Sequence, residues 1–343
     1  MERRFVRSRA VRRWVARATG ATVIGAAVLT AAPSATLAAP GPVRGARSLR
    51  RAPHPEASGP SVEPGATAHR WAPHATDGTV RSRVRMPPSP VAERPFAVAR
   101  DTIVVTDPTR PPSARAQGAP TQSLGTAGTD HRTLRVEVST PAGARGLLPL
   151  VVFAHGFDSE PARYRALLDA WTALGYVVAA PETPESAHDL PGEPRRDAIL
   201  EQSKDVSAVV TAMLHADPSI DPGRIAVAGH SDGGSSVAAL AIDPALSDPR
   251  IDAYVVLSGA IPDDISGHRS ADERGALLVV VGDADEFGDL GASGEVYREA
   301  ALTKELDVVP GGDHAGMYTG SSPLEEAVIA STERFLDRTL AEH

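Results

Sequence analysis

The sequence contains no cysteine, and this limits the chemistry that the chain can perform. Without a thiol it has no disulfide, no thiolate metal site and no cysteine nucleophile. Lysine is scarce as well, because only Lys204 and Lys304 occur and the other basic residues are arginine. Aromatic residues make up 4% of the chain, but hydrophobic residues reach 42%, which is sufficient for a core. The 343 residues allow one large domain or two small ones.

Motifs for metals and cofactors are also missing from the sequence. The histidine and acidic residues lack the spacing of metal ligands. The chain contains neither a phosphate-binding loop nor a dinucleotide-binding fingerprint. We therefore expect no metal and no other cofactor.

Charge divides the chain into a basic leader and an acidic body. Residues 1–100 contain 17 arginines and 5 acidic residues, whereas the remainder contains 18 basic and 38 acidic residues. A strongly negative body repels the phosphates of nucleic acids and of anionic lipids. We therefore expect no nucleic-acid partner.

The first forty residues have the pattern of a secretory signal. Seven arginines precede a short apolar run at about residues 18–32, and small residues follow at Thr36–Ala39. An uncleaved membrane anchor is the alternative, but the run is short and ends at Pro33, so it would span a bilayer poorly. We expect residues 1–38 to be removed and the protein to be secreted, without stable membrane insertion. Two pairs of adjacent arginines leave the twin-arginine export route open.

Residues 39–93 are rich in proline, glycine, alanine and arginine and show no apolar period. Such a segment buries too little surface to offset the entropy lost on ordering. We expect a disordered linker or pro-segment, whose arginines could contact an anionic cell envelope.

From residue 94 onward, segments typical of strands and helices alternate. The predicted strands are 96–105, 132–140, 148–155, 176–181, 224–230, 252–259, 276–282 and 304–311. The predicted helices are 161–175, 197–216, 235–242, 292–302 and 323–343. Most of these strands are apolar throughout, which is typical of a parallel sheet covered on both faces. The first two alternate polar and apolar residues, which suits an antiparallel edge. We expect one α/β domain over residues 94–343, with eight mostly parallel strands and helices on both faces.

The segment Gly229-His230-Ser231-Asp232-Gly233 forms a G-x-S-x-G motif. It follows a predicted buried strand and opens a helix, which is the setting of a nucleophile elbow. Glycine suits both flanking positions, because side chains there would collide in so sharp a turn. Ser231 could also be an ordinary turn serine in a glycine-rich chain, so its assignment as a nucleophile depends on partners elsewhere.

A serine nucleophile needs a base to take its proton and an acid to orient that base. In this architecture the acid precedes the histidine, and each follows a strand. Asp283, Asp285 and Glu286 follow one strand, and His314 follows the last. Taken singly, the acids could cap a helix and His314 could be a surface residue. Their joint order favours a triad.

The site also needs donors for the oxyanion that forms during acyl transfer. One is the backbone N–H of the residue after the nucleophile, which is Asp232. The other lies in the loop after the third strand, where His155-Gly156 brings the N–H of Phe157 close to the site. We expect the carboxylate of Asp232 to point away from the base and to favour the helix N-terminus by about 0.3–1 kcal/mol.

Several motifs between Pro95 and His343 carry a resemblance to a known superfamily. They are "FAVARDTIVVTDPTRP", "PLVVFAHGF", "LGYVVAAPETP", "RIAVAGHSDGGSS", "VVVGDADEF" and "VVPGGDHAG". With them the chain resembles an α/β-hydrolase. The branch that it resembles comprises bacterial platelet-activating-factor-acetylhydrolase-like, chlorophyllase-like and dienelactone-hydrolase-like enzymes, near the cutinase-type polyester hydrolases.

The resemblance assigns roles to the candidate residues. It implies Ser231 as nucleophile, His314 as base and Asp285 as acid, with Asp283 as the second choice for the acid. It also implies an oxyanion hole formed by the backbone N–H groups of Phe157 and Asp232. The chain departs from the pattern in two ways. Dienelactone hydrolases have cysteine where this chain has serine, and the residue after the nucleophile is here acidic.

These features predict a secreted serine hydrolase that cleaves carboxylic esters, EC 3.1.1 in type, through an acyl-enzyme. The expected substrates are esters of short-to-medium acyl chains or accessible polyester, because the candidate lid loops, 181–198 and 259–275, are short and polar. A peptidase or amidase of the same fold is one alternative, although no large gating domain is evident. A catalytically silent envelope-binding module is another, although it would not need a triad. We expect a monomer.

Overall fold

The structure is a computed structural model that describes residues 95–113, 115, 130–190, 193–265, 267, 274–287, 289–320 and 322–341. The predicted signal peptide, residues 1–38, and the predicted linker, residues 39–93, lie outside the described part. Both therefore stay predictions. The structural statements that follow refer to the described residues.

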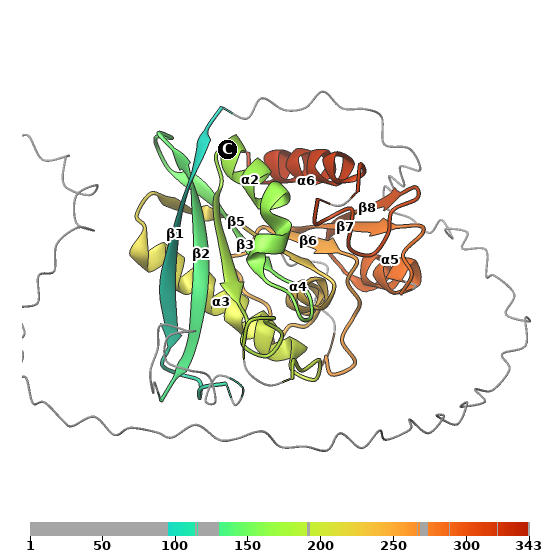
Figure 1. The fold of residues 1–343 in the computed structure, drawn as a ribbon, viewed down its shortest axis with the longest axis horizontal. Coiled ribbons are helices and arrows are strands. Elements are labelled where there is room, and N and C mark those ends of the chain that lie inside the picture. The colour runs from blue at the N-terminus through green and yellow to red at the C-terminus, as the bar shows by residue number, and fades with distance from the viewer. Residues whose placement is uncertain are drawn as a thin grey trace, which may run out of the picture. The chain divides into compact units, whose positions relative to one another are not determined.

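Among these residues, eight strands form one sheet in the order β1-β2-β4-β3-β5-β6-β7-β8 (Figure 1). The strands are β1 (Ala97–Asp107), β2 (Arg132–Ala142), β3 (Leu148–Ala154), β4 (Val177–Glu182), β5 (Ile220–His230), β6 (Ala253–Leu257), β7 (Ala276–Gly282) and β8 (Thr303–Val309). β2 runs antiparallel to both of its neighbours, and every pairing from β4 to β8 is parallel. The expected eight-stranded, mostly parallel sheet with an antiparallel edge is confirmed.

Helices cover both faces of the sheet. They are α2 (Arg165–Leu174), α3 (Ile199–Ala216), α4 (Asp232–Ile242), α5 (Asp289–Glu299) and α6 (Glu325–Thr339), with a short 3-10 helix, η2 (Pro161–Tyr164), before α2. In β3, Leu150 and Val152 pack into the core beneath α3, α4 and α5, whereas Val151 and Phe153 pack into the core beneath α2 and α6. Because successive side chains of a strand point to opposite faces, two buried faces require an uninterrupted apolar strand.

Two helices begin three residues earlier than the sequence predicts. α4 starts at Asp232 rather than at residue 235, and α5 starts at Asp289 rather than at residue 292. Five of the six residues added to the first turns are aspartate or glycine, which weaken an apolar period but are tolerated where a helix begins. For α5 the shift places Asp289 in the first turn, where the helix dipole favours negative charge, whereas Asp232 was already expected at the N-terminus of α4.

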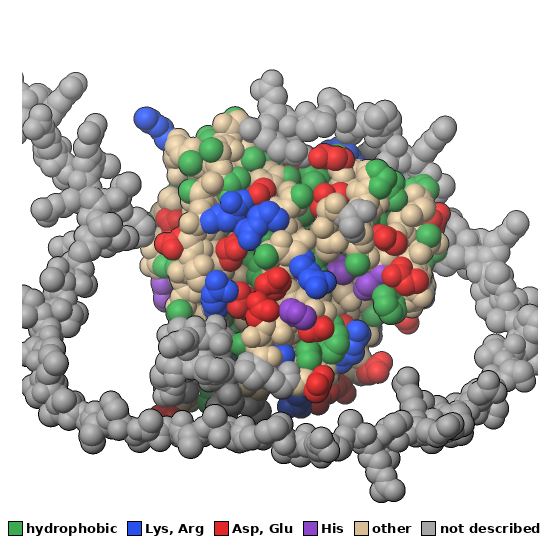
Figure 2. All heavy atoms as spheres, in the orientation of Figure 1, with side chains coloured by type: hydrophobic (Ala, Val, Ile, Leu, Met, Phe, Trp, Pro, Cys, Tyr) green, Lys and Arg blue, Asp and Glu red, His purple; other side chains and the backbone are tan. Residues whose placement is uncertain are grey.

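The surface of the described part carries charges of both signs. On the face shown in Figure 2, acidic and basic side chains lie side by side rather than in a continuous basic area. No helix in the described ranges is both long and apolar enough to cross a bilayer.

Candidate active site

Ser231 lies at a sharp turn between β5 and α4. Its backbone has φ 55° and ψ −121°, a conformation that non-glycine residues rarely adopt. A Cβ at Gly229 would lie 2.3 Å from the carbonyl oxygen of Gly233, and one at Gly233 would lie 2.1 Å from that of Ala154. Side chains at these two positions would therefore collide with backbone. This close approach is the physical reason for the two glycines of the motif.

His314 joins Ser231 to Asp285. The imidazole Nε2 lies 2.9 Å from the Ser231 hydroxyl oxygen, and Nδ1 lies 3.0 Å from Asp285 Oδ2. Asp285 can only accept a hydrogen bond when ionised, so Nδ1 carries the proton and Nε2 is left to accept one from Ser231. The side chain of Asp285 is fully buried, and that of His314 is 12% exposed. The structure thus brings together the three residues that the sequence singled out.

A second carboxylate, from Asp289, also lies at Nδ1 of His314. Asp289 Oδ2 is 2.8 Å from Nδ1 and Asp285 Oδ2 is 3.0 Å from it, so both carboxylates lie within reach of the Nδ1 proton. Burial alone would lower the pKa of His314, but Asp289 and Asp285 together raise it above its ordinary value. The ligand atoms of these three residues lie within 4.8 Å of one another, as they would in a metal site. The sequence shows no metal-ligand spacing for this group, because the three residues come together only in the fold.

The other two acids after β7 accept hydrogen bonds from backbone N–H groups instead. Asp283 accepts a hydrogen bond from the N–H of Gly311 at 2.6 Å, and Glu286 accepts one from the N–H of His314 at 3.1 Å. Neither carboxylate bonds to the imidazole ring. Of the three acids that the sequence left open, Asp285 is therefore the one on the ring.

The two residues predicted to supply the oxyanion donors both line the cleft at Ser231. Phe157 follows the tight turn after β3, and Asp232 is the first residue of α4. Among the described residues, neither backbone N–H donates to a protein acceptor. Two free N–H groups beside a serine hydroxyl suit a developing oxyanion.

A buried hydrogen-bond chain connects the Phe157 loop to the His314 loop. The N–H of Gly156 donates to the Tyr164 hydroxyl at 3.2 Å, and that hydroxyl lies 2.9 Å from Nδ1 of His230. Nε2 of His230 lies 2.7 Å from the carbonyl oxygen of His314, which can only accept, so this nitrogen carries the ring proton. Burial lowers the pKa of His230 to about 3 and keeps the ring neutral. The chain holds both loops relative to the elbow.

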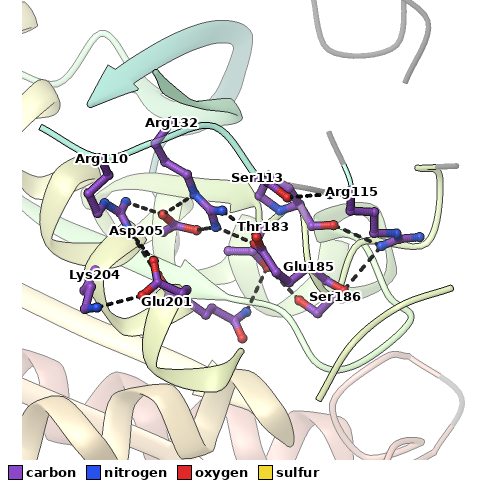
Figure 3. A network of polar contacts seen from close by, with 12 residues as sticks. Arg110, Ser113, Arg115, Arg132, Thr183, Glu185, Ser186, Glu201, Lys204 and Asp205 are labelled. Carbon is purple, nitrogen blue, oxygen red and sulfur yellow. Dashed lines mark hydrogen bonds and ion pairs between the residues drawn. The ribbon is translucent and has the colours of Figure 1, made fainter. Parts of the chain in front are cut away.

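A polar network fixes the loop after β4 (Figure 3). Arg132 donates to both carboxylate oxygens of Glu185, at 2.6 and 2.5 Å, and to Asp205 of α3 at 2.9 Å. Arg115 binds backbone carbonyls of the same loop, those of Pro184, Ala187 and Leu190. This loop leads into the wall of the cleft, so the network links the sheet edge to the site.

The cleft around Ser231 has a volume of about 430 Å³. Phe287, one of its lining residues, is 69% exposed, and its ring packs edge-on against His314 with 4.7 Å between ring centroids. Arg196, from the loop before α3, also lines the cleft, and its guanidinium lies 4.3 Å from the centre of the Phe157 ring. The cleft is therefore mixed in character, with an aromatic rim and charged groups near the serine.

The carboxylate of Asp232 does not behave as expected from its position in the sequence. The sequence predicts a carboxylate that favours the helix N-terminus and takes no further part. In the structure its side chain is 8% exposed, and its Oδ1 accepts a hydrogen bond from Arg196 at 3.2 Å. Its Oδ2 is buried and has no hydrogen-bond partner among the described residues. Burial raises the pKa of this group, and Arg196 offsets only part of the rise.

Four residues of the site were missed by the reasoning from sequence: Asp289, Arg196, His230 and Tyr164. Asp289 lies four residues after Asp285, and its position at the start of α5 was the one available signal. Arg196 and Tyr164 come from segments whose path across the cleft depends on tertiary packing. His230 occupies the first x position of the G-x-S-x-G motif, to which the motif assigns no role.

Comparison with known proteins gives one family match. The model of the chlorophyllase family matches residues 126–269, a segment that contains Ser231 and Phe157 and ends before Asp285. No curated protein matches the sequence.

Three solved structures resemble the chain at low sequence identity. DcsB, solved with a substrate analogue, has a TM-score of 0.50 at 15% identity, covering 63% of this chain and 98% of DcsB. The acylaminoacyl peptidase of Pyrococcus horikoshii has 0.51 at 16% identity, with 62% of this chain covered and 40% of the peptidase. A candidate dienelactone hydrolase of Klebsiella pneumoniae has a TM-score of 0.49 at 18% identity, covering 71% of this chain and 100% of the hydrolase. At these identities the likeness concerns the fold alone. The strand order and these matches show an α/β-hydrolase fold, and residues 126–269 are similar to the chlorophyllase family.

Proposed function

We propose that the protein is a serine hydrolase that cleaves carboxylic esters. The observation that carries this proposal is the continuous path from the Ser231 hydroxyl through His314 to the buried Asp285, with contacts of 2.9 and 3.0 Å. A serine hydroxyl becomes a useful nucleophile when an oriented neutral imidazole can take its proton. The strained backbone at Ser231 supports the same role, because it holds the hydroxyl at the head of α4 and toward the cleft.

The proposed reaction has two halves. Ser231 Oγ attacks the ester carbonyl carbon while its proton moves to Nε2 of His314, and the N–H groups of Phe157 and Asp232 donate to the oxyanion. Collapse of this intermediate breaks the bond to the alkoxy group, which leaves as an alcohol with the proton from Nε2. Water then attacks the acyl-enzyme in the same manner and releases the carboxylic acid. Asp285 stabilises the imidazolium that forms in each half.

The dimensions of the cleft favour compact acyl groups. A volume of about 430 Å³ is within the range of small-molecule sites. An exposed aromatic rim at Phe287 could also meet an apolar polymer chain at the surface. Esters of short-to-medium acyl chains, and accessible polyester, are therefore the substrates that we propose.

A panel of matched substrates tests the proposal. We expect the purified protein to hydrolyse p-nitrophenyl acetate, butanoate and octanoate, with less turnover of the dodecanoate because the cleft is compact. Polyester film is the polymer arm, and release of its soluble acid is the readout. The anilide that matches the best ester distinguishes an amidase, since we expect its kcat/KM to be far lower. Equal or faster cleavage of the anilide would favour the amidase, and no turnover of any ester would refute the proposal.

We also propose that the protein is exported and cleaved after Ala38, because its first residues follow the pattern of a secretory signal. N-terminal sequencing of the protein from the culture medium of a bacterial host is then expected to begin at Ala39. Recovery only from the cell interior, with Met1 retained, would refute export.

A further inference from the structure

The carboxylate of Asp232 is placed unusually for a group beside a nucleophile. Its side chain is more than nine-tenths buried, it lines the cleft, and its Oδ2 receives no hydrogen bond from the described residues. A buried oxygen without a donor costs free energy, so native structures rarely retain one without a reason. A ligand that supplies a donor would remove this cost.

Among the described residues, Arg196 is the hydrogen-bond partner of this carboxylate, and its side chain is weakly held. Its side chain is 64% exposed, and its contacts are the Asp232 Oδ1 at 3.2 Å and the face of the Phe157 ring at 4.3 Å. An exposed arginine can change rotamer at little cost, so its side chain can shift to admit a substrate while it stays paired with Oδ1. The other charged groups that act on Asp232 are His314, which lowers its pKa, and Asp289, which raises it.

We propose that Asp232 is a specificity residue that binds a hydroxyl group of the substrate, close to the scissile ester. This inference rests on the proposed ester hydrolysis, since it names the class of ester that the same site prefers. The N–H of Asp232 is the proposed oxyanion donor, so a group that reaches the carboxylate of the same residue must lie only a few bonds from the carbonyl. Hydroxyacyl esters and monoesters of diols place a hydroxyl at that distance.

The charge around Asp232 favours a neutral donor. Arg196 already neutralises the negative charge of Asp232. Oδ2 has almost no accessible surface in the structure, so a hydroxyl donates to it after the Arg196 side chain shifts, while Oδ1 keeps its ion pair. An ammonium group would have to compete with Arg196 for the same carboxylate. A substrate carboxylate would meet both Asp232 and Asp289 across the cleft and would be repelled.

The test compares esters that differ in one group. Initial rates by pH-stat give kcat/KM for ethyl butanoate, ethyl 3-hydroxybutanoate, 2-hydroxyethyl butanoate and ethyl 3-aminobutanoate. The readout is kcat/KM for each substituted ester divided by kcat/KM for ethyl butanoate. A general loss of activity in a variant affects both values equally and cancels in the ratio. We expect the wild type to favour at least one hydroxyl ester. In Asp232→Leu this preference is expected to fall about ten- to a hundredfold, as for a lost hydrogen bond to a charged group. In Asp232→Asn, which keeps a neutral acceptor, it should fall less.

Two further variants and one folding check complete the design. Arg196→Gln should keep the hydroxyl preference and raise the relative rate on the amino ester, because Asp232 then lacks its cation. Arg195→Gln is the matched control, since Arg195 pairs with Asp197 outside the cleft and should leave every ratio unchanged. Labelling of Ser231 by a fluorophosphonate shows that each variant is folded, and if the leucine variant fails to label, the near-isosteric Asp232→Asn decides.

The outcomes separate the two proposals. No hydrolysis of ethyl butanoate or of any other ester by the wild type would refute the ester hydrolase. Hydrolysis with equal ratios in wild type, Asp232→Leu and Asp232→Asn would overturn the hydroxyl site alone. A wild-type preference for the amino ester over both hydroxyl esters would also overturn it, because it would assign a cation to Asp232.

Discussion

Ester hydrolysis is expected to fall by at least about a thousandfold when Ser231 is replaced by alanine. His314 Nε2, 2.9 Å from Oγ, would then have no hydroxyl to deprotonate, and no acyl-enzyme could form. The residual rate would come from the oxyanion donors and from substrate binding. Initial rates on p-nitrophenyl butanoate, with fluorophosphonate labelling followed by intact-protein mass, measure both parts of the prediction.

A control serine shows that the loss is specific. Ser247, in the loop after α4, bonds to the carbonyl of Pro244 and does not line the cleft, so Ser247→Ala should retain activity and labelling. Alanine at residue 231 must adopt the same positive φ as serine, so thermal unfolding checks that both variants remain folded. If Ser231→Ala still reacts with the fluorophosphonate at the wild-type rate, another residue is the nucleophile.

Asparagine substitutions at the two acids on His314 are expected to have different effects. Asp285→Asn removes the negative charge beside Nδ1, and its amide N–H₂ can favour the wrong tautomer of the imidazole; in a serine triad such a change costs about 10⁴ in kcat. Here Asp289 lies 2.8 Å from the same nitrogen and can take over part of the role. We therefore expect a smaller loss for Asp285→Asn, about a hundredfold, and less than about tenfold for Asp289→Asn. The double variant should approach the loss of Ser231→Ala.

The pH profile gives a second readout that a purely structural role would not change. The base must be neutral, so kcat/KM falls as pH drops through the pKa of His314. Asp289 helps to raise that pKa, and removing its charge should lower it. The acid limb of Asp289→Asn should therefore move to lower pH than in the wild type.

Asp283→Asn is the matched control for the two acids. The Asp283 carboxylate accepts a hydrogen bond from the N–H of Gly311 and does not contact the imidazole. The acid limb of the pH profile of Asp283→Asn should therefore coincide with that of the wild type. A loss in Asp283→Asn as large as in Asp285→Asn would reverse the assignment of the acid. An unmoved acid limb in Asp289→Asn would show that the second carboxylate does not act on His314.

Much of the fold follows from local pattern. Fully apolar strands such as Val151–Ala154 can be stable only between two layers of helix, which predicts the parallel sheet and its coverage. The positions of Ser231, Asp285 and His314 could be predicted because each follows a strand, and parallel strands end at one edge of the sheet. The glycines at 229 and 233 could be predicted because the turn leaves no room for a Cβ.

The second acid and the charged wall of the cleft could not be predicted in this way. Asp289 reaches the imidazole only because α5 begins three residues earlier than its apolar pattern suggests. Arg196 reaches Asp232 and Phe157 because the loop after β4 is held by Arg132 and Arg115, which are distant in sequence. Such contacts depend on the path that a loop takes. A loop has no repeating pattern of apolar residues from which that path could be predicted.

By itself, the sequence determined the α/β class, the elbow serine, its histidine and a short set of acids. These depend on the period of apolar residues and on chain order, which are local properties. Only the tertiary structure decided that Asp285 rather than Asp283 meets the ring and that Asp289 meets it as well. It alone showed that Asp232, expected to act through its backbone N–H, has a buried carboxylate with one oxygen that receives no hydrogen bond from the described residues. The reason is that hydrogen-bond partners and burial depend on which distant side chains converge on a group, and no spacing along the chain specifies that.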